Sequence, residues 1–167
     1  LHCTLFARSA GNQDGLIIAY LGSGHSNAGQ FVFGIGNGSA WTMLLYSGST
    51  YGVNLWHHVA AVKNGDTYTL FVDGAQTVQQ TVAGVSDSYQ LKNASLGYWN
   101  YGSPAYLSGL IDEVSVTSRG LNPTEIQAIF DAGSAGKCRY GIPSPVGLIS
   151  AWSGDLNALD SRSRNNG

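Results

Sequence analysis

The sequence contains few charged residues. It has eight lysine and arginine residues and ten aspartate and glutamate residues, for a formal net charge of −2 over 167 positions. Without an excess of basic residues there is no attractive field for phosphates, so nucleic acid is excluded as an expected partner. No apolar run reaches about 18 residues and no signal-peptide pattern opens the chain, so we expect no membrane insertion. If the protein is secreted, its targeting segment has been removed or lies outside this sequence.

Cysteine is also scarce, since Cys3 and Cys138 are the only two in the chain. They do not form the CxxC spacing of a zinc site. A disulfide between the two positions and a pair of unpaired buried thiols both remain open.

Glycine, in contrast, occurs at 23 positions and separates short runs in which apolar residues alternate with polar ones. This pattern predicts strands. The runs lie at 31–36, 41–46, 56–62, 68–72, 77–82 and 110–116. The dipeptides Asn64-Gly65 and Asp73-Gly74 supply the positive φ angles that tight hairpins require. Many short strands in a chain of this length predict one all-β domain, built as a sandwich or barrel.

One short helix is predicted near residues 122–133. Asn122 can cap its N-terminus, Pro123 suits the first helical position, and Glu125 completes a capping box. Gly133 can end the helix. The apolar residues of the segment then share one face, which would pack against the sandwich. These residues are Ile126, Ile129 and Phe130.

Two blocks resemble the laminin-G-like, concanavalin-type jelly-roll domains of secreted bacterial proteins. The first is LWHHVAAVKNGDTYTLFVDG (55–74), similar to the central hairpin of those domains. The second is LSGLIDEVSVTSRGLNPTEIQAIFDAGSAGKC (107–138), similar to their last strand and C-terminal helix. The resemblance implies an all-β fold, a two-sheet antiparallel jelly-roll sandwich with one short C-terminal helix. It also implies an extracellular or cell-surface location.

The order of the segments departs from that family. The C-terminal sequence GLISAWSGDLNALDSRSRNNG resembles the first strand of such domains, yet it follows the helix. We therefore divide the chain into a domain at 1–138 that lacks its N-terminal strands, a linker at 139–145, and a first-strand-like segment at 146–167. This segment begins a following repeat, completes its own sandwich, or completes a neighbouring one. Each arrangement would cover an edge of unpaired backbone groups.

The histidines in the first block do not form a catalytic pair. His57 and His58 are consecutive strand residues and face opposite sides, so they cannot hold one metal ion. Asp73 precedes a glycine in a turn and is expected to accept turn amides. Asp112 and Glu113 are adjacent as well, and cannot face one sugar as glycoside hydrolysis requires. With no nucleophile motif in the chain, we expect no enzyme activity.

Two aromatic sets are candidates for ligand binding. The first belongs to residues 95–109 and consists of Tyr98, Trp99, Tyr101 and Tyr106, with Asn100 beside them. The second consists of Trp41, Tyr46 and Tyr51. Aromatic faces stack on the apolar surfaces of sugars, and an amide can bond to hydroxyls. A carbohydrate groove is predicted if both sets line one surface, and the alternative is that these aromatics cover the core.

A structural calcium ion is a further candidate ligand. Asp112 has the same strand parity as Leu110 and Val114, which predicts a carboxylate facing the interior, where it needs donors or a cation. The family resemblance implies that calcium is sometimes held near this strand and the first-strand loop. Asp155 and Asp160 offer oxygen ligands in the corresponding loop. The alternative is that these residues make hydrogen bonds in turns and caps.

We predict a non-catalytic extracellular module that binds glycans or other surface polymers as part of a larger secreted or cell-surface protein. One alternative is a structural repeat or self-assembling subunit of an extracellular fibre, in which 146–167 is a bridging segment and strand 146–152 mediates self-association. A polysaccharide-active enzyme of the same fold ranks third, because no inward-facing acid, base or nucleophile set is visible.

Overall fold

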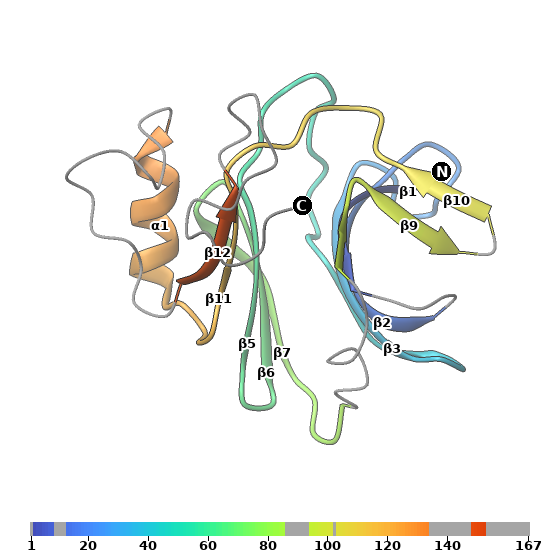
Figure 1. Cartoon of the computed structure of the whole chain (residues 1–167), viewed down its shortest axis with the longest axis horizontal. Coiled ribbons are helices and arrows are strands. Elements are labelled where there is room, and N and C mark those ends of the chain that lie inside the picture. The colour runs from blue at the N-terminus through green and yellow to red at the C-terminus, as the bar shows by residue number, and fades with distance from the viewer. Residues whose placement is uncertain (1, 9–12, 86–93, 102, 134–147, 153–167) are drawn as a thin grey trace.

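A computed structural model of the chain describes residues 2–8, 13–85, 94–101, 103–133 and 148–152 (Figure 1). The strands are β1 (His2–Arg8), β2 (Asp14–Leu21), β3 (Phe31–Asn37), β4 (Trp41–Tyr46), β5 (Val59–Asn64), β6 (Thr67–Val72), β7 (Ala75–Thr81), β8 (Ala94–Leu96), β9 (Tyr98–Tyr101), β10 (Ser103–Tyr106), β11 (Val114–Thr117) and β12 (Leu148–Trp152). The helix is α1 (Pro123–Asp131).

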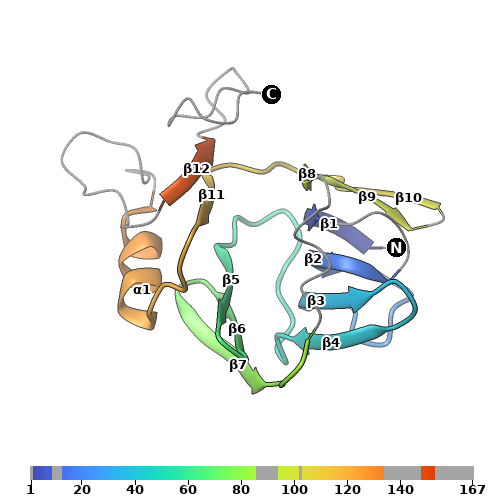
Figure 2. The ribbon, with the colours of Figure 1, turned by 60° about the horizontal axis from the view of Figure 1, so that its bottom comes forward.

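Two antiparallel sheets form the body of the protein. One has five strands in the order β4-β3-β2-β1-β8, and the other has three in the order β5-β6-β7. The two sheets face each other, and α1 lies on the far side of the three-stranded sheet (Figures 1 and 2). The predicted all-β sandwich with one short helix is confirmed.

The core lies between the two sheets. Phe33 and Ile35 of β3 pack in one cluster with Tyr68 and Leu70 of β6, and each of the four is at most 1% exposed. Alternate residues of β3 and β4 enter this cluster, because successive strand residues face opposite sides. They are Phe31, Phe33, Ile35, Met43 and Leu45. The opposite face of the five-stranded sheet is therefore left for other contacts.

Two strands at the N-terminal end of the chain were missed by the sequence pattern. β1 and β2 pair antiparallel, with a bulge between Thr4 and Phe6. In β2, Ile17 is buried on one face, while Leu16 and Ile18 pack against the core on the other. A strand that is apolar on both faces does not alternate, so its sequence gives no period-two signal.

The helix forms where its capping signals predict it. The backbone N–H of Glu125 donates to Asn122 Oδ1 at 2.9 Å, and the backbone N–H of Asn122 donates to Glu125 Oε2 at 2.9 Å. This reciprocal pair is the predicted capping box. Ile126 is 2% exposed and anchors the helix. The guanidinium of Arg119 donates two hydrogen bonds to the Glu125 carboxylate.

The Asn122–Glu125 capping pair predicts that the stability of the fold decreases slightly at acid pH. Hydrogen bonds from Arg119 and then from the Asn122 backbone lower the pKa of Glu125 to about 2. Because the folded pKa lies below the unfolded value of about 4.3, the ionised carboxylate stabilises the fold above that pH, and its contribution is lost as the pH falls towards 2. Thermal unfolding measured from pH 5 to pH 2 should therefore show a smaller decrease in Tm for Glu125→Gln than for the unmodified chain.

The effect in that experiment is small because both partners are exposed to solvent. Glu113→Gln is the matched control, because it makes the same change at a residue outside the capping box. Identical pH profiles for Glu125→Gln and the unmodified chain would contradict the proposed role of the cap.

The C-terminal segment pairs within the chain. β12 is antiparallel to β11, with Ser115 opposite Ala151 and Val116 opposite Ser150. The three arrangements that the sequence leaves open for 146–167 stay predictions. The boundaries at 138, 139 and 146 lie outside the described residues and stay predictions.

The predicted strand at 110–116 is wrong in its first half. β11 begins only at Val114, because Glu113 adopts a positive φ of 54° that interrupts an extended chain. Leu110 is consequently 79% exposed. The predicted strand at 56–62 also begins late, at Val59, and leaves Trp56 67% exposed in the loop before it.

Candidate functional site

The histidine-containing stretch is held by structural hydrogen bonds. Asp73 Oδ1 accepts the backbone N–H of His58 at 3.0 Å, and Asp73 Oδ2 lies 2.9 Å from Nδ1 of His57. The other ring nitrogen of His57 lies 3.2 Å from the carbonyl oxygen of Gly52. The carboxylate thus fastens the start of β5 to the β6–β7 turn. The prediction that Asp73 accepts amides of its own turn is wrong in its partners, since the hydrogen bonds described for the carboxylate are to the two histidines.

Tyr51, from the second aromatic set, belongs to this structural cluster. Its ring centroid lies 5.3 Å from Phe31 and 5.4 Å from His57. Burial and then the nearby Asp73 carboxylate raise the pKa of the Tyr51 hydroxyl. Tyr51 therefore does not lie with Trp41 and Tyr46, the other two members of its aromatic set.

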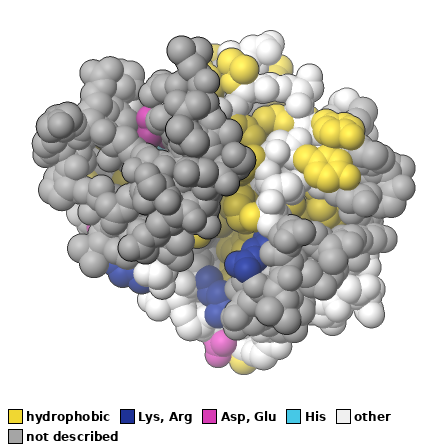
Figure 3. All heavy atoms as spheres, in the orientation of Figure 1, with side chains coloured by type: hydrophobic (Ala, Val, Ile, Leu, Met, Phe, Trp, Pro, Cys, Tyr) yellow, Lys and Arg dark blue, Asp and Glu magenta, His cyan; other side chains and the backbone are white. Residues whose placement is uncertain are grey.

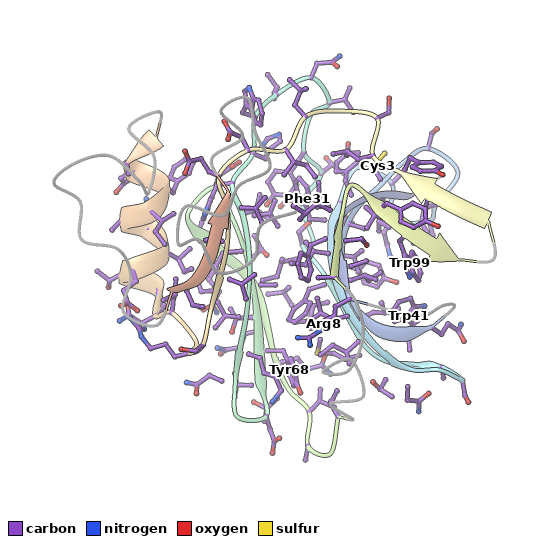
Figure 4. The ribbon with its side chains drawn as sticks, viewed as in Figure 1. Cys3, Arg8, Phe31, Trp41, Tyr68 and Trp99 are labelled. Atoms are coloured by element: carbon purple, nitrogen blue, oxygen red, sulfur yellow. The ribbon has the colours of Figure 1, made fainter. Side chains whose placement is uncertain are left out.

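The other face of the five-stranded sheet carries a continuous apolar surface, which we call the outer face. We define it by the side chains that point away from the core: Ala7, Ile17, Ala19, Leu21, Val32, Trp41, Leu44 and Tyr46. Phe31 and Tyr68 lie between the sheets, whereas Trp41 and Trp99 lie on the opposite side of the five-stranded sheet (Figure 4). None of the residues in this set is charged.

Gly34 allows three side chains to converge at the centre of the outer face. A Cβ atom at this position would lie 2.9 Å from Leu44 Cδ2, 3.1 Å from Ile17 Cγ1 and 3.3 Å from Trp41 Cζ3. These distances are shorter than ordinary van der Waals contacts. These three side chains can meet over β3 because Gly34 has no side chain.

Trp99 of β9 is brought to the same place. The β9–β10 hairpin lies beside β1 (Figure 1), and Trp99 is 3% exposed, packed with Ala7 and Ile17. Its ring centroid lies 5.6 Å from that of Trp41, with an interplanar angle of 56°. Two tryptophans that are 58 positions apart in the sequence thus meet on one face.

A cavity of about 230 Å³ opens beside these tryptophans. Aliphatic side chains of β2, β3 and β4 form its floor, and Gln13 and His25 add polar groups at its margin. The His25 ring lies 6.2 Å from the Tyr46 ring, and its Nδ1 accepts the backbone N–H of Asn27 at 3.0 Å. The cavity is lined by Gln13, Ile17, Leu21, His25, Val32, Trp41, Leu44, Tyr46 and Trp99.

The structure brings together only some of the predicted binding residues. Trp41, Tyr46 and Trp99 all line the cavity, so one member of the first set and two of the second share a surface. Gln13 and His25, together with the aliphatic floor, were missed. Nothing in the sequence marks these residues as parts of a binding site, because polar residues are common in loops and apolar residues are common in strands.

Tyr98 and Tyr106 lie on the other side of the hairpin. They are directly opposite each other on β9 and β10, with ring centroids 5.2 Å apart. Neighbouring strand residues face opposite sides, so Tyr98 points away from the surface that Trp99 contacts. Hydrophobic side chains are gathered over this hairpin, whereas lysine and arginine side chains lie at the lower centre of the same view (Figure 3). Asn100 and Tyr101 lie on β9, with side chains outside the described part.

The prediction that Asp112 faces the interior is wrong. Asp112 is exposed, precedes β11, and accepts the backbone N–H of Glu113 at 2.8 Å. The parity argument fails because the strand does not extend to this residue. Asp155 and Asp160 lie outside the described residues, as does Cys138. Calcium binding therefore stays a prediction, and the choice between a Cys3–Cys138 disulfide and two free thiols stays open.

Within the described ranges, no group of three or more histidine, cysteine, aspartate or glutamate side chains is placed to hold a metal ion. In the same part of the chain, no helix is both long enough and apolar enough to cross a membrane.

The antiparallel two-sheet sandwich places the protein in the class of jelly-roll β-proteins. The profile of the family described as the concanavalin A-like lectin/glucanases superfamily matches residues 2–127. The chain belongs to this superfamily, and the predicted family is confirmed. The match covers every described element from β1 to β11 and ends within α1.

Six solved chains are similar to this one. One is the crystal structure, at 2.1 Å resolution, of an S-layer domain-containing protein (residues 221–444) from Clostridium thermocellum ATCC 27405. It is 21% identical with a TM-score of 0.42, and the alignment covers 71% of this chain. The chain spans 57% of the length of that structure. No curated protein sequence matches the chain.

Proposed function

We propose that the protein is a non-catalytic module that binds a neutral sugar unit of an extracellular glycan or surface polymer in the outer-face cavity. The observation that carries the proposal is the contact between Trp41 and Trp99, with Trp41 placed over Gly34, in a setting without carboxylate, lysine or arginine among the described lining residues. Membership of a superfamily named for lectins and glucanases supports a carbohydrate as the ligand.

The chemistry of the lining suits a sugar ring. The half-buried rings of Trp41 and Tyr46 can pack against the apolar C–H face of a pyranose, while the buried Trp99 packs against Trp41. Gln13, His25 and Tyr46 provide polar atoms for the hydroxyls of the sugar. The cavity volume of about 230 Å³ is below the range of about 300–1,000 Å³ that is typical of sites for drug-sized ligands. We therefore propose that it takes a single ring at a chain end or branch.

The composition of the cavity favours binding over hydrolysis. Glycoside hydrolysis uses two carboxyl groups about 5 to 9 Å apart, on either side of the scissile bond. None of the described residues that line the cavity is an aspartate or a glutamate. Among the same residues there is no lysine or arginine, which an acidic sugar would require for strong recognition. The proposal therefore specifies neutral sugars.

Affinity electrophoresis of the unmodified chain through gels that contain different polysaccharides tests this proposal. We expect at least one neutral glucan, mannan or galactan to retard the chain, and polymers rich in uronic acid to have no effect. Added free monosaccharide should reverse the retardation, because it competes for the same cavity. Retardation by acidic polymers alone, or by none of the panel, would contradict the proposal.

A further inference from the structure

We propose that β12 is an exchangeable strand, so that Leu148–Trp152 of one copy of the chain completes the β11 edge of a second copy. Within the described strands, β12 pairs with β11 alone, and the two form a separate two-stranded sheet. The same antiparallel register is available to a β12 strand from either copy. The inference is independent of the proposed glycan site, which lies on the five-stranded sheet.

The β11 edge requires a partner strand. Unpaired backbone groups at a sheet edge are costly when they are buried, and they are a template for pairing with another chain. Val114, Ser115, Val116 and Thr117 of β11 are all only half-exposed, so its edge lies partly inside the protein. Next along the chain, Gly120 lies against β5, where an added Cβ would be 3.1 Å from the Lys63 carbonyl oxygen. β11 is thereby fixed and ready to accept a strand.

The sequence of β12 has no feature that prevents intermolecular pairing. Edge strands are commonly protected by charged residues, by proline or by a bulge that twists the edge away. The sequence LISAW contains no charged residue, no proline and no glycine. The register of β12 shifts by one residue between its pairings with Val116 and Thr117, and this irregularity would be the same against the β11 edge of a second copy. A strand of this kind can leave one edge and occupy an identical one without a steric or electrostatic penalty.

The connection between α1 and β12 is long enough for exchange. Residues 134–147 provide 14 positions, which at about 3.3–3.6 Å each can span up to about 50 Å. A folded chain of this size has a radius of gyration of about 15 Å, and so a diameter of about 40 Å. The strand of one copy can therefore reach the β11 edge of an adjacent copy.

The fraction of chains that exchange β12 is set mainly by the protein concentration. Because the exchanged strand makes the same contacts, the two forms differ chiefly in the effective concentration of the tethered strand, which for a short linker is on the order of millimolar. Exchange should therefore be minor at micromolar protein and should rise in proportion to monomer concentration. Copies held together in an array would favour it.

Disulfide trapping between single-cysteine chains tests the exchange. In a background in which Cys3 and Cys138 are replaced by serine, one chain carries Ser115→Cys and another carries Ala151→Cys. These positions face each other across the β11–β12 pair, at a separation that a disulfide can bridge. We expect an equimolar mixture, refolded at about 1 mM and oxidised, to give a disulfide-linked heterodimer whose fraction falls on refolding at about 10 µM.

Two controls make the result decisive. Ser150→Cys is one position out of register with Ser115, so its mixture with Ser115→Cys should give little heterodimer. A chain carrying both Ser115→Cys and Ala151→Cys should form an internal disulfide in dilute solution. An internal disulfide without heterodimer at any concentration would overturn the proposal, as would equal yields from the paired and out-of-register mixtures.

Sedimentation of the unmodified chain gives a second measurement that does not depend on the folding of the variants. We expect a dimer fraction that increases with concentration between about 10 µM and 1 mM and that depends on refolding. A chain that stays monomeric at about 1 mM after refolding would overturn the proposal as well.

Discussion

Trp41→Ala is expected to weaken binding of a neutral polysaccharide by about 10- to 100-fold, a loss of about 1.4–2.8 kcal/mol. The indole of Trp41 forms one wall of the cavity and contacts Trp99 at 5.6 Å between centroids. Aromatic anchors of this kind contribute a disproportionate share of binding free energy. Isothermal titration with the polysaccharide that retards the unmodified chain measures the change.

Trp56→Ala is the matched control for Trp41→Ala. It removes the same side chain from a residue that is 67% exposed in the β4–β5 loop and does not line the cavity. We expect its affinity to stay within about twofold of the unmodified chain, since a contact that is not made cannot be lost. Equal losses for the two variants, or a loss with Trp56→Ala alone, would contradict the proposed site.

A folding measurement must accompany the binding data. Trp41 also packs against the cluster of Ala7, Ile17 and Trp99, so its truncation will lower stability as well as affinity. Near-ultraviolet circular dichroism and urea unfolding establish that Trp41→Ala is folded at the temperature of the titration. Binding measured under those conditions then reports on the cavity.

Gly34→Val is expected to lower the free energy of unfolding by about 1–3 kcal/mol and to abolish polysaccharide binding. Its Cβ would lie 2.9 Å from Leu44 Cδ2 and 3.3 Å from Trp41 Cζ3, so both side chains must move. The added methyl groups would also displace Trp41 from its position beside Trp99. Urea unfolding measures the first effect and affinity electrophoresis the second.

Gly109→Val is the control for the Gly34 substitution. A Cβ at Gly109 would lie 3.6 Å from Leu107 Cδ1, an ordinary van der Waals distance. We expect a change in stability within about 0.5 kcal/mol and unaltered binding, as for most surface substitutions. A Gly34→Val chain that binds with the affinity of the unmodified protein would show that the convergence over Gly34 does not create the site.

Features that depend on near neighbours were predicted correctly. The Asn64-Gly65 turn forms with a Gly65 φ of 59°, and the capping box joins Asn122 to Glu125, three residues away. In both cases the stabilising contact lies within a few residues of the signal. His57 and His58 contact different neighbours, Phe31 and Tyr51 for His57 and Phe130 for His58, although both residues precede β5, which begins at Val59.

Features that depend on pairing between distant segments were not predicted. The period-two pattern overlooked β1 and β2, because β2 is apolar on both faces. The interior position expected for Asp112 is wrong, since the strand begins only after the positive φ of Glu113. A parity argument holds only as far as the strand itself extends.

The sequence by itself determined the β-sandwich class, the two turns at Asn64-Gly65 and Asp73-Gly74, and the capped helix, because turn φ angles and helix caps involve residues close together in the chain. Only the tertiary structure decided which aromatics form a site. Trp41 reaches Trp99 because the β9–β10 hairpin lies beside β1 and because Gly34 leaves room over β3. Tyr98, next to Trp99 in the sequence, faces the other way. The register and packing of strands far apart in the chain set these positions, and no local pattern encodes them.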